Sequence, residues 1–329
     1  MLNDFPEKIL VTPLAAESFG VRSMCTYIST PDLRILVDPG VSLGKRFGLP
    51  PHPEEYRALQ TMREKILKFA AVADIETISH YHFDHYTPTF SDYIWHWSTY
   101  EAAEKTYGNK LILAKSIKTK INYSQRRRGW LFRETVSKIA KSIEDADGRC
   151  FKFGGTTLRF SDPVYHGEEH TALGWVLMLT VEYAGEHVTH ASDVQGPLLN
   201  STLDMLLSDP PQLLIVSGPP VYLTDYSIDK KSINIAVQHL ATLAEKIPII
   251  ILEHHLLRAE DWRIVVKPVY ESAEEAGHKV YTAAEFLGLP NNLLEQTRRL
   301  LYKMNPPTND FIKWTKTNEP LRKITQPPI

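Results

Sequence analysis

The sequence predicts an α/β protein in which short buried strands alternate with amphipathic helices along most of its 329 residues. A chain of this length can bury a large core, either as one large domain or as two smaller ones. Its composition is 43% hydrophobic and 23% charged with a net charge of −2. These values indicate neither a disordered chain nor a strongly basic nucleic-acid binder.

The first part of the chain predicts an opening sheet followed by a helix. Its apolar runs are short and end in turn residues, which is typical of strands, and one longer run has helical spacing. In order, the predicted elements are strands at 9–15, 24–29 and 33–38, a turn at Pro39-Gly40, a helix from Pro53 to Phe69 and a buried strand at 74–80.

The segment 91–147 predicts a mainly helical insertion around a short strand, LILA, and it separates two halves of the sheet. The last residues, 303–329, contain NPP and QPPI and predict an extended C-terminal tail, so that the main domain spans 1–302. Between them the sequence predicts strands at 150–153, 156–160, 173–183, 187–193, 213–218, 247–253 and 278–282, and helices at 229–246 and 260–276.

Targeting signals are not evident, and we expect a soluble cytoplasmic protein with no membrane partner. The N-terminal MLNDFPEKIL lacks a basic stretch followed by an apolar core. Apolar runs fall well short of the ~20 residues that a membrane span requires. Cys25 and Cys150 form no CxxC pair, which fits a reducing cytosol. A bound metal would therefore need histidine and carboxylate ligands.

The stretch SHYHFDHYTP places His80, His82, Asp84 and His85 directly after the predicted strand at 74–80. Burying so many polar groups is costly unless a cation compensates them. Residues two apart in an extended segment point the same way, so His80 and His82 can bind one ion. Asp84 and His85 follow one short turn later and can bind a second.

Four side chains cannot saturate two ions, so further ligands must come from other strand ends. A lone histidine after a strand is usually a surface or capping residue, but a whole series of them is hard to reach by chance. The candidates that follow strands are His166, with His170 as its alternative, Asp193, and the pair His254 and His255.

The motif HYHFDH resembles the HxHxDH signature of the metallo-β-lactamase fold. ILVDPG and HASDVQG are similar to the family's Asp-Pro-Gly turn and to the strand that presents a metal-bridging aspartate. Together with ESFGVRS and LEHHLLR, these segments resemble a mainly archaeal group of predicted hydrolases with no assigned substrate. The resemblance implies a four-layer αβ/βα sandwich with a dinuclear metal site at one edge of its two sheets.

The resemblance also implies a ligand set of two groups joined by a bridging carboxylate, Asp193. His254 is preferred over His255 because Arg258 follows it four residues later, as in the tRNA-processing and phosphodiesterase branches. GEEHTALG lacks the thioesterase-like His-Thr-Pro-Gly-His pattern, so a glutathione thioester is not expected. The implied ligands are His80, His82 and His166 for the first ion, and Asp84, His85 and His254 for the second.

Two divalent ions can generate hydroxide from a shared water near neutral pH. We expect zinc, with iron or manganese as alternatives. Asp84 would also hold or accept the proton of the water. The carboxylates expected to orient ligand imidazoles are Asp38 and Asp74. Candidates for the acid that protonates the leaving group are His255, which we favour, His170, Glu169 and Glu253.

The substrate is predicted from SQRRRGW, which offers Arg126, Arg127 and Arg128 to phosphate and has Tyr123 and Trp130 nearby for stacking on a base. This favours hydrolysis of a phosphodiester or another phosphorylated small molecule or nucleotide. A solvated helix face is the alternative meaning of the arginine run. Two other functions compete with this one. The protein could hydrolyse a lactone, amide or other carbonyl, or it could be a metal-stabilised binding protein with little turnover. The sequence leaves open whether the chain forms a homo-oligomer.

Overall fold

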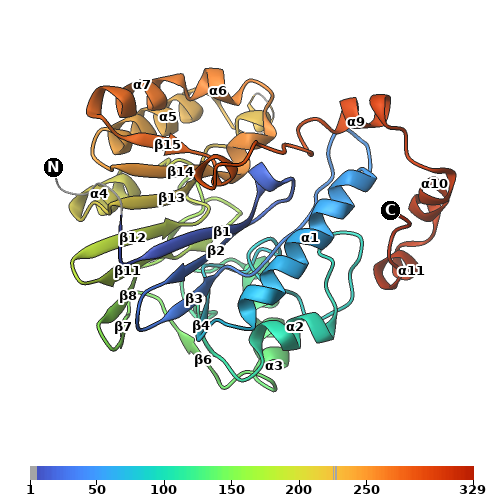
Figure 1. Cartoon of the computed structure of the whole chain (residues 1–329), viewed down its shortest axis with the longest axis horizontal. Helices are drawn as coiled ribbons and strands as arrows, with labels where there is room; N and C mark the ends of the chain where they lie inside the picture. The colour runs from blue at the N-terminus through green and yellow to red at the C-terminus, as the bar shows by residue number, and fades with distance from the viewer. Residues whose placement is uncertain (1–5, 225, 227) are drawn as a thin grey trace.

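The computed structural model describes residues 6–329 except 225 and 227. Within this part of the chain, two β-sheets stack face to face and helices cover both outer faces (Figure 1). The first sheet has the order β1-β2-β3-β4-β5-β6 and the second β15-β14-β13-β12-β11-β8-β7, while β9 and β10 form a separate pair. The predicted αβ/βα sandwich is confirmed.

The first sheet is antiparallel from β1 to β3 and parallel from β3 to β6. The second is parallel from β12 to β15. Its strands are β1 (Leu10–Ala16), β2 (Met24–Ser29), β3 (Arg34–Val37), β4 (Ile75–Ile78), β5 (Leu111–Ala114), β6 (Ser142–Asp145), β7 (Cys150–Phe153), β8 (Thr156–Phe160), β9 (Val164–Tyr165), β10 (Trp175–Val176), β11 (Met178–Tyr183), β12 (Glu186–Ala191), β13 (Leu213–Ser217), β14 (Ile249–Glu253) and β15 (Lys279–Tyr281).

The core between the sheets is built from the facing side chains of both. Ile35 and Ile75 come from the first sheet, and Ile215 and Ile251 from the second, all nearly fully buried. Each such side chain contributes roughly 1.5–3 kcal/mol by leaving water. Because helices also cover the outer faces, the central parallel strands β5, β13 and β14 are nearly continuous apolar runs without polar alternation, which is why the sequence identified them as strands.

Helices α1 to α3 cover the first sheet and α4, α5 and α7 cover the second (Figure 1). No helix in the described ranges is long and apolar enough to cross a membrane. The helices are α1 (Pro53–Ala70), α2 (Tyr100–Tyr107), α3 (Tyr123–Val136), α4 (Asn200–Ser208), α5 (Lys230–Ala244), α6 (Trp262–Val265), α7 (Lys267–Ala276), α8 (Ala283–Phe286), α9 (Arg298–Met304), α10 (Asn309–Lys316) and α11 (Glu319–Ile324), with 3-10 turns η1 (Glu17–Phe19), η2 (Val221–Leu223) and η3 (His254–Arg258).

Helix α1 fixes the loop that follows β4. The guanidinium of Arg63, 1% exposed, donates to Thr87 Oγ1 and, at 3.4 Å, to the carbonyl of Pro39. Gly40 lies so close to this loop that a Cβ would meet the backbone nitrogen of His85 at 2.4 Å. A side chain at position 40 would therefore displace the loop, which explains the glycine of the DPG turn.

The segment 91–147 differs from its prediction as a mainly helical insertion. It contributes β5 and also β6, which pairs in parallel with β5 and extends the first sheet. The sequence of β6, SIED, is short and mostly polar, and the strand is only partly buried at the sheet edge. Such an edge strand carries almost no apolar periodicity, so the sequence pattern missed it.

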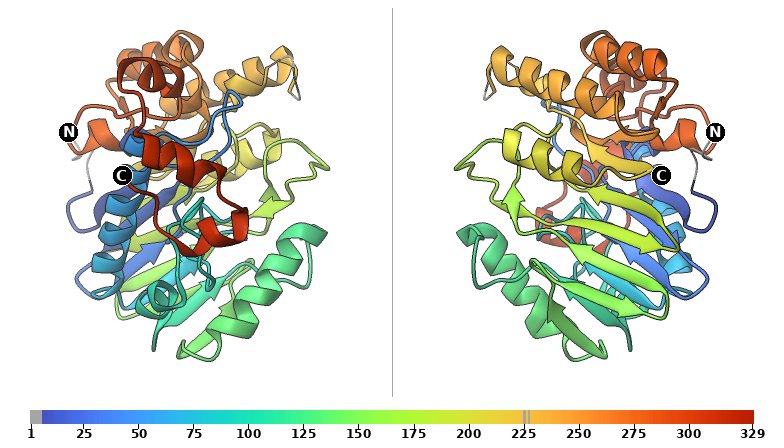
Figure 2. Two further views of the ribbon diagram at one scale, coloured as in Figure 1. Left: turned by 90° about the vertical axis from the view of Figure 1, so that its right-hand side faces the viewer. Right: turned by 90° about the vertical axis from the view of Figure 1, so that its left-hand side faces the viewer.

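The segment 303–329, predicted as an extended tail, instead forms α10 and α11, which lie in front of the molecule in the left view of Figure 2. Thr308 and Asn318 cap the two helices. Phe311 and Trp314 pack edge-on against Tyr56 of α1, with ring centroids 5.8 and 5.5 Å away. The prolines that suggested an extended chain lie outside the helices or in a first turn, where proline is tolerated.

Glu76 of β4 is fully buried, and neither of its carboxylate oxygens has a hydrogen-bond partner. Burial raises the pKa of Glu76 well above its ordinary value. The folded state therefore keeps a proton that the unfolded chain releases above about pH 4.3. Stability from this group is present at low pH and is lost as the pH rises toward the folded pKa, by about 1.4 kcal/mol per pH unit.

We expect Glu76→Gln to remove this loss of stability at rising pH, because the amide has the shape of the protonated carboxyl and does not titrate. Melting temperatures of wild type and variant should diverge between pH 5 and pH 8, with the variant more stable at pH 8. Glu104→Gln, on the exposed face of α2, is the matched control and should follow wild type. Parallel melting curves for wild type and Glu76→Gln across this range would refute the expectation.

Candidate metal centre

The predicted ligands meet at one edge of the two sheets, beyond the carboxyl ends of their strands. His80, His82, Asp84 and His85 lie in the loop after β4, as the resemblance implied. The remaining members come from the other sheet and from the β9–β10 pair, and they are His166 after β9, Asp193 after β12, and His254 and His255 after β14.

The first group of ligand atoms is formed by His80, His82, His166 and Asp193, which lie within 4.8 Å of one another. Asp193 Oδ2 is 2.9 Å from His166 Nε2 and 3.4 Å from His80 Nε2. Three imidazoles and one carboxylate around a common point suit a zinc ion.

The second group is formed by Asp84, His85 and His254, again within 4.8 Å. Asp193 reaches this group as well, because its Oδ2 is 3.2 Å from His85 Nε2 and its Oδ1 is 3.2 Å from His254 Nε2. Asp193 therefore lies between the two groups, where a bridging carboxylate is required.

Several buried polar atoms of this cluster have no hydrogen-bond partner among the described residues. An unsatisfied buried polar atom costs about 1–3 kcal/mol, so a concentration of them at one point needs an explanation. Lone pairs directed at a shared cation provide it, and the residues present fit a divalent metal pair. These atoms are Nε2 of His80, His85, His166 and His254, Nδ1 of His255 and Oδ1 of Asp193.

Charge on His80, His82 and Asp193 of the first group is distributed as metal ligation requires. Burial, helped by His85, lowers the pKa of His80 to about 4, and burial with His80 lowers the pKa of His82 well below its usual value. Both imidazoles are therefore neutral. Burial disfavours a charged Asp193, but His254 and His85 outweigh it and hold the pKa of Asp193 well below its usual value. Neutral imidazoles and an ionised carboxylate are the forms that bind metals.

Two ligand imidazoles, those of His85 and His80, are oriented by hydrogen bonds at Nδ1. His85 Nδ1 is 2.9 Å from Asp38 Oδ2, so Asp38 has the orienting position expected of it. His80 Nδ1 donates to Ser79 Oγ at 2.9 Å, since the Ser79 hydroxyl is itself donated to Asp38. These bonds leave each Nε2 free for a metal. Asp74 was wrong as a second orienting residue, because it pairs with Arg34 on the surface.

Glu17 is the orienting residue that the sequence did not reveal. His254 Nδ1 donates to its Oε2 at 2.9 Å, and its Oε1 pairs with Arg258. Burial disfavours a charged His254, but Glu17 and Asp193 raise the pKa of His254 above its usual value. Glu17 lies 237 residues before His254. Its only sequence signal was an acidic residue two positions after the predicted strand at 9–15.

Three residues of the site adopt left-handed backbone conformations although none is glycine. They are Asp38 (φ 48°), Asp193 (φ 49°) and His254 (φ 67°), and each follows directly or closely after a strand. Such a conformation costs about 1–3 kcal/mol for a residue with a Cβ, and it persists where a functional position demands it.

The other residues predicted as a ligand or as the acid lie outside the metal-ligating cluster. His170 is exposed and contacts Tyr165, and Glu169 is exposed beside it. Glu253 accepts hydrogen bonds from backbone N–H groups, including those of Ala283 and His254, and therefore serves to hold chain segments together. Neither His170, Glu169 nor Glu253 belongs to a group of metal-ligating atoms among the described residues.

The two adjacent histidines occupy different positions. His254 is fully buried and its Nε2 is 3.6 Å from Asp84 Oδ2. His255 is 12% exposed, and its Nδ1 is 3.8 Å from Asp193 Oδ1. The geometry favours His254 as the second-ion ligand and leaves His255 at the rim of the cluster.

No protein-family model matches the chain. It is 45% identical over 289 residues to the UPF0282 protein of Methanopyrus kandleri, a match that covers 88% of this chain and 97% of that one. The chain belongs to the UPF0282 family. Among solved structures, it resembles a possible metal-dependent hydrolase from Veillonella parvula, with a TM-score of 0.50 and 15% identity over 80% of this chain and 94% of the other.

A further solved structure, the metallo-beta-lactamase fold protein YhfI of Bacillus subtilis, matches with a TM-score of 0.48 and 13% identity over 83% of this chain and 95% of the other. Identities at this level concern the fold alone. The stacked sheets, the outer helices and the HYHFDH loop at the strand ends give this UPF0282 member the metallo-β-lactamase fold.

In this UPF0282 member we expect Glu17→Gln to weaken zinc binding at the second group by about 10–100-fold, because His254 loses the carboxylate that fixes its ring. Competition with a chelating dye measures the affinity. Glu182→Gln is the matched control, since Glu182 also pairs with an arginine, Arg159, but lies away from the ligands. An unchanged zinc affinity for Glu17→Gln would show that His254 does not need this support.

Proposed function

We propose that the protein is a metal-dependent hydrolase with a dinuclear centre, zinc before iron or manganese, that acts on a phosphodiester or another phosphorylated small molecule or nucleotide. One observation carries the proposal. Unpartnered imidazole nitrogens from three separate strand ends surround Asp193, with His80, His166 and His254 each within 3.4 Å of its carboxylate. Free cysteines, Cys25 and Cys150, agree with the reducing cytosol that we assign to it.

Two bound divalent ions would acidify a water and neutralise charge on the scissile group. Among the chain's own residues, Asp84 is placed to hold that water. Its side chain is 19% exposed, so it borders the opening of the site and the cluster at once. Burial disfavours a charged Asp84, but His85 and His254 lower its pKa, and it enters the reaction as a carboxylate that can accept a proton.

His255 is the proposed proton donor, and the proposal rests on position. Of the four acid candidates, only His255 lies in the cluster. Burial and His254 hold the pKa of His255 well below its usual value, so it starts neutral. It must first receive a proton, for which Asp84 is the proposed source, before it can pass one to the leaving group.

Fewer of the three arginines in SQRRRGW can contact a substrate at the metal centre than the sequence suggested. Consecutive residues of a helix point about 100° apart, and Arg126 and Arg127 of α3 are exposed to solvent. Arg128 is half-buried, lies 5.4 Å above the Phe83 ring and interacts electrostatically with Asp84. Its buried Nε has no partner. Of the three arginines, we propose Arg128 alone as a contact for a phosphoryl group at the centre.

A substrate panel tests the proposal. The zinc-loaded protein should hydrolyse bis(p-nitrophenyl) phosphate with a kcat/KM at least about tenfold above its values for a p-nitrophenyl ester, a lactone and a β-lactam, because local positive charge favours an anionic substrate. Preference for an uncharged ester or lactone would instead support a carbonyl hydrolase. Absence of turnover on all of them would support a metal-stabilised binding protein.

Two arginine variants sharpen the test. Arg128→Ala should raise KM for the phosphodiester by about tenfold or more without changing metal content, because a charge-assisted contact with a desolvated group is lost. Arg127→Ala removes an equal charge from a solvated face and should leave KM within about twofold. An equal rise of KM in the two variants would mean that only the total positive charge of the protein, and no direct contact of Arg128, affects substrate binding.

A further inference from the structure

A second set of arginines gathers at the metal edge of the sheets. Arg22 lies between β1 and β2, Arg46 follows β3, and Arg258 ends η3 after β14. Strand β1 runs parallel to β3, because both are antiparallel to β2. The loops after β1 and β3 therefore leave the first sheet at the edge where the loop after β4 carries its ligands. Tyr222 of η2 joins them from the loop after β13.

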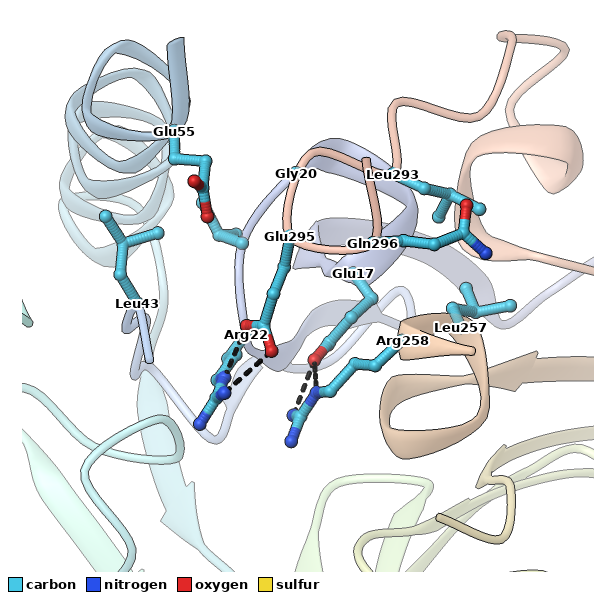
Figure 3. A pocket seen from close by; sticks show the side chains of 11 residues that line it. Glu17, Gly20, Arg22, Leu43, Glu55, Leu257, Arg258, Leu293, Glu295 and Gln296 are labelled. Atoms are coloured by element: carbon cyan, nitrogen blue, oxygen red, sulfur yellow. Dashed lines mark hydrogen bonds and ion pairs between the residues drawn. The ribbon is translucent and has the colours of Figure 1, made fainter. Parts of the chain in front are cut away.

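Two of these arginines are held rigidly by carboxylates. Arg22 forms a two-pronged pair with Glu295, with both distances 2.7 Å, and Arg258 pairs with Glu17. In Figure 3 the two guanidinium groups lie side by side, with both carboxylates on the same side of them. The cavity bordered by these residues is only about 10 Å³, room for one water, so it cannot itself hold a substrate.

Arg46 differs from Arg22 and Arg258 because it forms no ion pair with a described carboxylate. Its guanidinium lies 4.3 Å above the Tyr222 ring and donates to the Arg258 carbonyl at 3.2 Å, while its buried Nε has no acceptor. No described carboxylate lies within ion-pair distance of it. Burial lowers the pKa of Arg46, the nearby Glu295 carboxylate opposes this change, and repulsion from Arg22 and Arg258 adds to it. The three arginines have two carboxylate partners among the described residues, Glu17 and Glu295, which leaves one positive charge in the group without an ion pair.

The guanidinium positions are built into the backbone. A Cβ at Gly44 would lie 1.8 Å from Cζ of Arg22, so this glycine leaves the space that the guanidinium fills. Arg258 Nη1 donates to the Tyr222 hydroxyl at 3.1 Å, while its Nη2 and Nε both contact Glu17 Oε1, and its side chain is 3% exposed. Arg22 remains 22% exposed and Arg46 is partly exposed, so an anion can reach them from outside.

We propose that Arg22, Arg46 and Arg258, with the Tyr222 ring, bind a second phosphoryl group of the substrate beside the metal centre. The link to that centre is direct, because Glu17 contacts both Arg258 and His254, and Arg258 interacts electrostatically with Asp84. This inference rests on the proposed hydrolase function, and it narrows the substrate to a molecule that carries a phosphoryl group in addition to the one that is cleaved.

Calorimetric titration of the zinc-loaded full chain with inorganic phosphate, in chloride buffer of low ionic strength, tests the subsite. Arg46→Met keeps the apolar stem over Tyr222 and removes the charge. We expect it to bind one phosphate equivalent fewer than wild type, or to bind that equivalent at least about tenfold more weakly. Arg46→Lys should recover part of the affinity. Arg149→Met, which removes an arginine stacked on Phe151 away from the site, should match wild type.

Equal phosphate stoichiometry and affinity for wild type and Arg46→Met, or no phosphate binding by wild type, would overturn the subsite. Binding that both Arg46→Met and Arg149→Met weaken alike would overturn it too, because the effect would then follow net charge. The titration needs no turnover. If the protein fails to hydrolyse bis(p-nitrophenyl) phosphate, the proposed hydrolase function is contradicted. The phosphate subsite would still be supported if Arg46→Met binds one phosphate equivalent fewer than wild type.

Discussion

Asp193→Ala is expected to remove most of the bound metal and to lower hydrolysis by more than about 100-fold. Asp193 contacts both ligand groups through its two carboxylate oxygens, so its loss takes a ligand from each ion at once. Removal of residues that only support ligands already costs about 10–100-fold, and a shared ligand should cost more. No other substitution in the cluster is expected to affect both ions directly.

Elemental analysis of zinc-loaded, desalted protein provides the measurement. Wild type should hold about two ions per chain and the variant fewer than about one. Asp74→Ala, at a surface carboxylate paired with Arg34, is the control and should keep the wild-type content. Circular dichroism must show that Asp193→Ala is folded. A folded variant with about two ions would show that Asp193 is no bridge.

His254→Ala should remove one ion of the two, whereas His255→Ala should keep both and lower kcat by about 100-fold or more as a lost proton donor. The difference follows from their positions. His254 is fully buried against Asp84 and fixed by Glu17, while His255 lies at the rim. Metal content and kcat must be measured on the same preparations to separate the two roles.

His170→Ala is the matched control for these two variants, because His170 is exposed and outside the cluster. It should change neither metal content nor kcat. A greater metal loss in His255→Ala than in His254→Ala would transfer the ligand role to His255. Unchanged kcat in His255→Ala with full metal content would assign proton donation to water.

Local patterns of the sequence were sufficient for most of the fold and for the core of the site. The strands at 24–29, 150–153 and 156–160 have the predicted bounds. Such a strand is indicated by β-branched and aromatic residues that are adjacent in the chain and bounded by turn residues, so this signal does not depend on where the neighbouring strands lie. The loop after β4 carries four candidate ligands within six residues, and their close spacing alone indicated a metal.

Long-range contacts required the tertiary structure. Glu17 contacts His254, which lies 237 residues later in the chain, and Arg46 contacts the Tyr222 ring from the loops of the other sheet. No periodic pattern in the sequence indicates either contact. The adjacent arginines of SQRRRGW appeared equivalent until the helix turned Arg126 and Arg127 into solvent and Arg128 toward Phe83.

The sequence by itself determined the fold class, the loop of four adjacent candidate ligands and the strand ends that complete the cluster. The tertiary structure decided which of two adjacent histidines is buried, which carboxylates orient the ligands and which arginines face the centre. The reason is physical. Strand and turn preferences depend on each residue and its near neighbours, whereas side-chain direction and partner choice depend on packing between segments that are distant in the chain.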